Sequence, residues 1–299
     1  MTTFEQRLAS HAAATDEFLG TAFDRLEGVP KRLGDAMQLA VMGGGKRFRP
    51  FLLIETAAMF DILPEQAVVA AGALECLHCY SLVHDDLPAM DNDRLRRGQP
   101  TVWAAFDDWT AILAGDALLT ISFQLVADQA VHSDPSVRAQ LVTALAKAAG
   151  PEGMVGGQAL DLMSDKLGQP VEPDLPYIRR LQAMKTGALI RFACEAGAIL
   201  GAAAQQDRQV LRSFGDRLGI VFQIADDLLD ATGNAETVGK ATGKDAAAGK
   251  ATQVSGLGIP AARDYLAETA GAALADLAPF GERSAVLAEA VHFAAERSK

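Results

Sequence analysis

Three carboxylates crowd together at the end of an apolar stretch, where Asp85 and Asp86 are followed by Asp91. On a continuous helix, Asp85 and Asp91 would point about 120° apart and lie about 9 Å apart along the axis, too far to share one ion. Pro88 interrupts the helical hydrogen-bond ladder, so we expect the chain to turn and bring Asp91 back toward Asp85. Crowded oxygen ligands favour Mg²⁺ over zinc. A solvated acidic loop is the alternative interpretation.

A second acidic cluster strengthens the metal interpretation. Asp226 and Asp230 stand at i and i+4 in a helical pattern, Gly219–Asp230, and like charges at that spacing destabilise a helix unless a cation compensates them. Each cluster ends an apolar helix, so we expect the two to face each other across a bundle. Such a pair could hold several Mg²⁺ ions on one polyphosphate. The alternative is an ordinary surface helix.

The glycine-rich stretch GGGKRFRP, residues 43–50, is a candidate anion loop. It is not a nucleotide-binding Walker A loop, because Arg47 follows Lys46 where Ser or Thr is required, and no strand precedes it. Backbone amides together with Lys46 and Arg49 still suit a diphosphate.

Further basic residues follow the acidic clusters. Arg96 and Arg97 could bind phosphate oxygens in a bidentate manner, although a solvent-exposed arginine pair is the simpler interpretation in isolation. Lys185 lies in an apolar helical pattern, where a lysine is costly without a partner. The glycine-rich segment 231–258 is expected to be either a mobile lid or a simple flexible loop. It carries Lys240, Lys244 and Lys250.

Composition narrows the class of protein. The 299 residues are 49% hydrophobic and 22% charged, which predicts a sizeable core. The net charge of −11 argues against non-specific binding to nucleic acid. Cys76 and Cys79 form a C-x-x-C, but one remaining cysteine makes neither a zinc site nor a disulfide framework, so two buried residues one helical turn apart are expected.

The chain is predicted to be all-α, a single domain over residues 1–299 built as a bundle of long helices. Alternating β-branched runs are absent, and N-cap signals precede Pro135 and Pro176. We find no signal peptide and no apolar run approaching the roughly 18 residues of a membrane span, which predicts a cytoplasmic protein. Helical periodicity is found in Leu33–Met42, Phe51–Met59, Ala67–His84, Ile112–Ala130, Val137–Ala149, Pro176–Leu200, Val210–Leu229 and Tyr265–Leu277.

These motifs together resemble the trans-isoprenyl diphosphate synthases, in particular the bacterial short-chain farnesyl diphosphate synthases. The resemblance runs from about Lys46 to Lys250 through GGGKRFRP, HDDLPAMDNDRLRRGQPT, GMVGGQALDL, MKTGALI and GIVFQIADDLLD. It implies antiparallel helices around a deep central cavity, usually in a homodimer. The chain departs from the pattern at Trp103, where many relatives have His, and at Gln253-Val254, which replaces a common Tyr-Pro.

The resemblance also implies residue roles. Several Mg²⁺ ions, for which Mn²⁺ can substitute, would be bound by Asp85, Asp86, Asp91, Asp226 and Asp230. The allylic diphosphate would be contacted by Arg96, Lys185 and Lys240, with Lys250 as a further substrate-binding residue. The diphosphate of isopentenyl diphosphate would be held by Lys46, Arg49, His78 and Arg97. Thr186 and Gln223 would place oxygens near the developing cation. For His78, a core histidine is the alternative.

The residues before the first motif predict the product. Tyr80 precedes Asp85 by five residues, which places it about 7.5 Å down the helix, where the growing tail would lie. A large side chain there closes the cavity floor, whereas Ser81 is too small to do so. The prediction is farnesyl diphosphate; alternatively Tyr80 only packs against a neighbouring helix. The rival functions are geranylgeranyl diphosphate synthase, class I terpene cyclase and a non-catalytic subunit.

Overall fold

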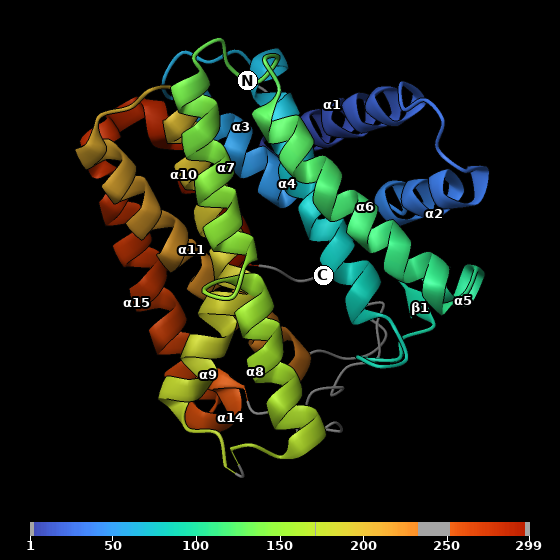
Figure 1. Ribbon diagram of the computed structural model, residues 1–299. Helices are drawn as coiled ribbons and strands as arrows, with labels where there is room; N and C mark the ends of the chain where they lie inside the picture. Colours follow the sequence, from blue (N-terminus) through green and yellow to red (C-terminus); the bar gives the residue numbers. More distant parts are fainter. Residues whose placement is uncertain (1–2, 171, 233–251, 297–299) are drawn as a thin grey trace. The chain divides into compact units, whose positions relative to one another are not determined.

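The structure, a computed structural model, describes residues 3–170, 172–232 and 252–296. It divides into two compact units, one of residues up to Leu145 with Ile199–Ala202, the other of Ala146–Ala198 and the residues from Ala203 onward. Both are built almost entirely from helices within these described ranges (Figure 1), which confirms the all-α prediction.

The first unit is organised around α4. Its elements are α1 (Phe4–Asp24), α2 (Lys31–Met42), α3 (Phe48–Ala58), α4 (Pro64–Asp85), β1 (Leu95–Arg96), β2 (Gln99–Pro100), α5 (Val102–Ala105), α6 (Asp108–Ala127) and most of α7 (Pro135–Ala149). Helices α1, α3 and α6 pack against α4, and α4 and α6 run side by side in Figure 1. A Cβ at Gly115 of α6 would overlap the ring of His84, so glycine permits this close approach. His84 Nε2 then donates to the Ile112 carbonyl at 3.1 Å, which fixes the end of α4.

The second unit is organised around the 28-residue helix α11. Its elements are α8 (Met154–Leu167), α9 (Leu175–Gln182), the π-helix η1 (Ala183–Gly187), α10 (Ala188–Leu200), α11 (Gln205–Thr232), α14 (Gln253–Leu257), α15 (Ile259–Leu277), the 3₁₀ segment η2 (Ala278–Ser284) and α16 (Ala285–Ala295). Helix α11 packs along α15 and also contacts η1, α14 and α16.

The predicted helices are present, with shifted ends and one interruption. Helix α7 begins at Pro135, and the Asp174 carboxylate caps α9 by accepting from the Tyr177 amide at 2.8 Å. The pattern predicted as one helix from Pro176 to Leu200 is broken by η1. Besides the helices, β1 and β2 form a short antiparallel hairpin that the sequence pattern did not indicate.

Two helices correct the expectation about membrane spans. By length and composition, α4 and α6 are both apolar enough to cross a bilayer. The apolar window of α4 is 72% buried inside the protein, which identifies it as a core helix, whereas that of α6 is 39% buried. Helix α6 exposes a stripe formed by Trp109, Ile112 and Leu113.

Candidate active site

The chain turns back after α4, as the position of Pro88 predicted. Helix α4 ends at Asp85, and the Asp91 amide donates to the Asp85 carbonyl at 2.8 Å. Asn92 adopts a left-handed backbone (φ 56°), and its amide donates to the Leu87 carbonyl at 3.0 Å. The turn therefore brings the first and third aspartates of the motif into adjacent positions of the backbone.

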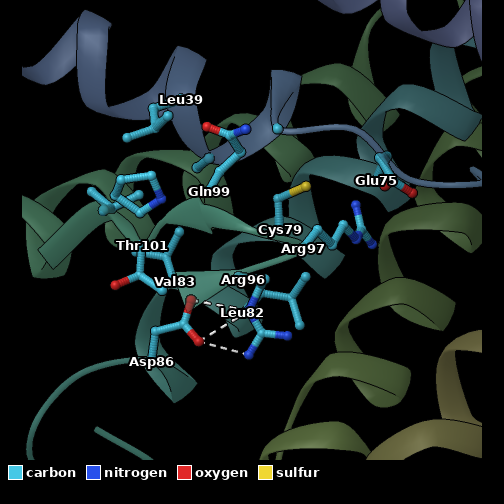
Figure 2. Close-up of a pocket in the computed structure, with 14 residues that line it drawn as sticks. Leu39, Glu75, Cys79, Leu82, Val83, Asp86, Arg96, Arg97, Gln99 and Thr101 are labelled. Carbon is cyan, nitrogen blue, oxygen red and sulfur yellow. Dashed lines mark hydrogen bonds and ion pairs between the residues drawn. The ribbon is translucent and has the colours of Figure 1, made fainter. Parts of the chain in front are cut away.

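The middle aspartate is engaged by an arginine. Arg96 Nε lies 3.0 Å from both carboxylate oxygens of Asp86, and Arg96 Nη2 lies 2.6 Å from Oδ1 (Figure 2). Burial raises the pKa of Asp86, an effect that the Arg96 hydrogen bonds partly offset. The predicted roles of Asp86 as a metal ligand and Arg96 as a diphosphate contact would require this pair to open, and they stay predictions.

The β1–β2 hairpin aims the neighbouring arginine at the glycine loop. Arg97 and Gly98 form its turn, both with positive φ, which is the type I′ geometry that matches strand twist. The Arg97 guanidinium packs so closely on Gly45 that a Cβ there would overlap it. The two segments line a small cavity of about 50 Å³ with Glu75 and Cys79 of α4, shown in Figure 2.

Within GGGKRFRP, Arg47 points into the protein. Its side chain is 1% exposed and bonds Glu75 (Nη1–Oε1, 2.6 Å), Asp16 (Nε–Oδ1, 2.8 Å) and the Val41 carbonyl (Nη2–O, 2.5 Å). This inward ion-pair network anchors the loop to α1 and α4. It leaves the neighbouring Lys46 exposed at the loop surface.

The histidine predicted to join the loop residues does lie beside them. His78 Nε2 is 3.4 Å from Arg49 Nη1. The pKa of His78 lies well below its ordinary value, first because the ring is enclosed and then because Arg49, Arg97, Arg96 and Arg47 are all positively charged. The structure therefore places His78 beside Arg49 and within the positive field of Arg97 and the other arginines, a composition suited to an anionic group.

Tyr80 lies inside the first unit on α4. Its side chain is 5% exposed, and the ring meets His84 edge-on at 5.7 Å between centroids. Burial, with the negative charge of Asp85 as the lesser cause, raises the pKa of Tyr80 to about 12, so the phenol stays neutral. Cys76 and Cys79 on the same helix are buried thiols, which confirms the prediction that they are core residues.

In the second unit, η1 is held between two helices by glycines. A Cβ at Gly157 of α8 would overlap the backbone of Lys185, and one at Gly219 of α11 would lie 2.9 Å from Gly187 Cα. Single-turn π segments inside α-helices are frequent at functional sites. This one presents Lys185 to Asp161 of α8, with 2.6 Å between Nζ and Oδ2.

The second acidic motif has one buried and two half-buried carboxylates. Asp227 is 4% exposed, and its oxygens accept from the side chains of Gln182 (2.9 Å) and Gln223 (3.0 Å). Asp226 and Asp230 are half-buried. Carboxylate oxygens suit Mg²⁺, and α11 sets these two residues one turn apart on one face, as the i, i+4 spacing predicted.

The predicted metal ligands lie among the described residues, whereas the predicted lid lysines do not. In the described ranges, no three His, Cys, Asp or Glu side chains converge to form a metal-binding group. The metal role of the five aspartates therefore stays a prediction. The lysines assigned to the lid, Lys240, Lys244 and Lys250, lie outside the described residues.

Sequence reasoning missed several partners of the site. Asp161 was visible as a carboxylate in GMVGGQALDL, but nothing in the spacing paired it with Lys185. Gln182 carried no signal, and Gln253 stood out only as a departure from the family pattern. Trp103, the other departure, donates from Nε1 to the Asp93 carbonyl at 2.8 Å and stacks under Arg94, so it braces the segment after the first motif.

Known proteins match the chain over most of its length. The polyprenyl synthetase family model matches residues 30–272. A farnesyl diphosphate synthase of Geobacillus stearothermophilus is 43% identical over 264 residues, covering 88% of this chain and 87% of that protein. Geranylgeranyl pyrophosphate synthase 4 of Arabidopsis thaliana is 37% identical over 263 residues, 88% of this chain and 69% of that protein. A crystal structure of an FPP/GFPP synthase from Zymomonas mobilis has a TM-score of 0.86 at 42% identity, with 97% and 98% of the two chains covered.

Proposed function

This chain belongs to the polyprenyl synthetase family and is a short-chain prenyltransferase of isoprenoid biosynthesis, and we propose that its main product is farnesyl diphosphate. The substrates in this proposal are isopentenyl diphosphate and an allylic primer, dimethylallyl or geranyl diphosphate. The observation that carries the farnesyl assignment is Tyr80, a bulky buried side chain on α4 five residues before Asp85. Geranylgeranyl diphosphate is the second candidate product, because relatives with both specificities match at similar identity.

The isopentenyl substrate is held through its diphosphate by the loop after α2. Lys46 and Arg49 supply charge, and Arg97 reaches the same loop from the hairpin turn. His78, which is neutral next to Arg49, offers a ring nitrogen for a hydrogen bond rather than a further charge. In this proposal a diphosphate held in this way keeps the double bond next to the bound primer, so that attack proceeds from a bound neighbour rather than from a chance collision.

The allylic diphosphate is bound by Arg96 and Lys185, with Lys240 as a third contact. Bound Mg²⁺ supplies the positive charge that neutralises the departing diphosphate, and Asp85, Asp91, Asp226 and Asp230 are the residues that would hold it, with Asp86 assisting. In the structure Arg96 is paired with Asp86, and Lys185 is paired with Asp161. The incoming diphosphate therefore replaces a carboxylate as the partner of each basic side chain. Until substrate binds, the two ion pairs keep both basic side chains oriented.

The allylic C–O bond then breaks, and the cation has to be shielded from water and stabilised. Gln223 donates its amide nitrogen to Asp227, so its amide oxygen is turned away from that carboxylate and is available to the cation. Thr186, in the π-helix, supplies the second oxygen. The isopentenyl double bond attacks the cation, and the proton released from the product passes to the departed diphosphate.

We further propose that the protein is a cytoplasmic homodimer. The exposed stripe of Trp109, Ile112 and Leu113 on α6 supports a protein partner, and a second copy of this chain is the partner that the family resemblance suggests.

The test is an incubation of the purified protein with labelled isopentenyl diphosphate and each allylic primer in turn, followed by chain-length analysis. Farnesyl diphosphate as the main product supports the proposal. Mainly geranylgeranyl diphosphate would move the assignment to the second candidate, and cyclised hydrocarbon without chain elongation would contradict prenyl transfer.

A further inference from the structure

A chain of side-chain amides joins three segments of the second unit. Gln182 is the last residue of α9, Asp227 lies in α11 and Gln253 is the first residue of α14. Gln253 Nε2 donates to Gln182 Oε1 at 2.7 Å, and Gln182 Nε2 donates to Asp227 Oδ2 at 2.9 Å. The three helices are thus linked through two glutamine side chains.

The hydrogen bonds that link Gln253, Gln182 and Asp227 all run in one direction, toward the carboxylate. A carboxylate oxygen accepts from the Gln182 nitrogen, and the Gln182 oxygen is thereby turned to Gln253. Gln253 must then donate its own nitrogen. Its Oε1 consequently lies buried without a hydrogen-bond partner among the described residues. Leaving a buried acceptor unpaired is unfavourable, so the arrangement calls for an explanation beyond packing.

Asp227 accepts hydrogen bonds from three donors. Besides Gln182, its Oδ2 accepts from the Gln253 backbone amide at 3.1 Å, and its Oδ1 accepts from Gln223 Nε2 at 3.0 Å. With both oxygens used in this way, Asp227 serves as an anchor that points into the protein. Asp226 is its neighbour on the helix, so the rotation that buries Asp227 also decides where Asp226 points.

Apolar packing keeps Gln253 at this point. The adjacent Val254 is 6% exposed and packs in one cluster with Ile224 and Leu228 of α11. Thr252 caps α14 by accepting from the Ser255 amide at 3.1 Å. Helix α14 is therefore held to α11 in two ways. Val254 packs against the apolar residues on either side of Asp227, and Gln253 is hydrogen-bonded to Asp227 directly and through Gln182.

We propose that Gln182 and Gln253 are positioning residues for prenyl transfer. By holding Asp227, they fix the rotation of α11, so that Asp226 and Asp230 are presented to cations bound to diphosphate and the Gln223 oxygen is presented to the allylic cation. The inference rests on the proposed metal-binding role of Asp226 and Asp230.

The experiment compares Gln182→Met, Gln253→Met and the double variant with the parent. Methionine keeps length and volume but removes the amide. The matched control is Gln209→Met, an exposed glutamine on the same helix α11. Binding of Mn²⁺ is titrated in the presence of saturating inorganic diphosphate, with free Mn²⁺ measured by electron paramagnetic resonance. Circular dichroism and thermal unfolding establish that each variant is folded, and either single variant suffices for the test.

The expected result is a loss of about ten-fold or more in Mn²⁺ affinity for each single variant, the range typical of partners that orient metal ligands. The double variant should lose no more than either single one, because both act through one hydrogen-bond chain. In steady-state assays, kcat should fall and the Mg²⁺ requirement should rise, while the KM for isopentenyl diphosphate stays at the parent value. Gln209→Met should match the parent in every measurement.

The Asp226→Ala variant distinguishes failure of the proposed metal site from failure of the positioning role of the two glutamines. If Asp226→Ala weakens Mn²⁺ binding but folded Gln182→Met and Gln253→Met do not, the glutamines are structural only and the inference is overturned. If Asp226→Ala itself leaves Mn²⁺ affinity unchanged, the metal role fails and the inference fails with it. Lower thermal stability with unchanged metal affinity and kcat would likewise contradict a positioning role.

Discussion

Lys185 Nζ lies 2.6 Å from Asp161 Oδ2, so the lysine of the π-helix forms an ion pair with a carboxylate of α8. The side chains are 26% and 15% exposed, so the pair is accessible to an incoming anion and yet restrained by its surroundings. A lysine prepositioned in this way can exchange one anionic partner for another without reorganising the helix.

Lys185→Ala is expected to raise the KM for the allylic diphosphate, because a cation aimed at that substrate is removed. The KM for isopentenyl diphosphate should change little. Lys185→Arg, which retains the charge, is the control and should lie between the parent and the alanine variant. Steady-state kinetics with each substrate varied in turn measure both constants; a selective effect on isopentenyl diphosphate would overturn the assignment.

Arg49→Ala is expected to give the opposite pattern, with a raised KM for isopentenyl diphosphate. Arg49 lies 3.4 Å from His78 in the arginine-rich cluster of the first unit, which we assign to that substrate. The same two-substrate kinetics apply. A change confined to the allylic KM would contradict the division of roles between the two basic groups.

Asp85→Ala and Asp226→Ala should each lower turnover by about 10²–10³, the usual effect of removing one preorganised electrostatic partner. Activity should also require Mg²⁺ or Mn²⁺, since the ligands are carboxylates. Turnover rates before and after addition of a chelator, with Mg²⁺ then restored in excess, measure this requirement. Undiminished turnover in excess chelator would be incompatible with the proposed metal site.

Stability should depend on pH through His78. The pKa of His78 in the folded protein is well below its ordinary value of 6.5, so on acidification the unfolded chain takes up this proton first. The free energy of unfolding therefore rises with pH through the window between the folded and the unfolded pKa of His78. The contribution of His78 to stability is present above pH 6.5 and is lost as the pH falls below that value. The free energy of unfolding, measured by denaturant unfolding at pH values between 5 and about 8, should depend less steeply on pH for His78→Gln than for the parent. Identical slopes would show that His78 is not held neutral.

The sequence was sufficient where one local signal decides the backbone. Pro88 predicted the turn that sets the Asp91 amide on the Asp85 carbonyl, and the i, i+4 spacing placed Asp226 and Asp230 on one face. It was insufficient where the partner comes from a distant segment. The Asp86–Arg96 pair depends on a hairpin whose turn uses Arg97 in a left-handed conformation, without the Asn-Gly or Asp-Gly signal that marks such turns.

The amide chain at Asp227 illustrates the same limit. Helical periodicity separates Asp227 from Asp226 by about 100°, which is enough to put them on different faces. Gln223 donates from α11 itself, but the other two donors come from the end of α9 and the start of α14, and no spacing in the sequence relates Gln182 to Gln253. Only the tertiary structure brings them together.

The most direct test of the central claim is the chain-length distribution of products from the parent and from Tyr80→Ala, measured side by side with geranyl diphosphate as primer. Ser81→Ala, a small change at the adjacent residue, is the control and should give the parent's products. The parent should make mainly farnesyl diphosphate, and Tyr80→Ala should shift the distribution to geranylgeranyl diphosphate or longer, because a side chain that is 5% exposed is removed from the proposed cavity floor. A Tyr80→Ala enzyme with the parent's product lengths, or a parent that makes mainly geranylgeranyl diphosphate, would contradict the account.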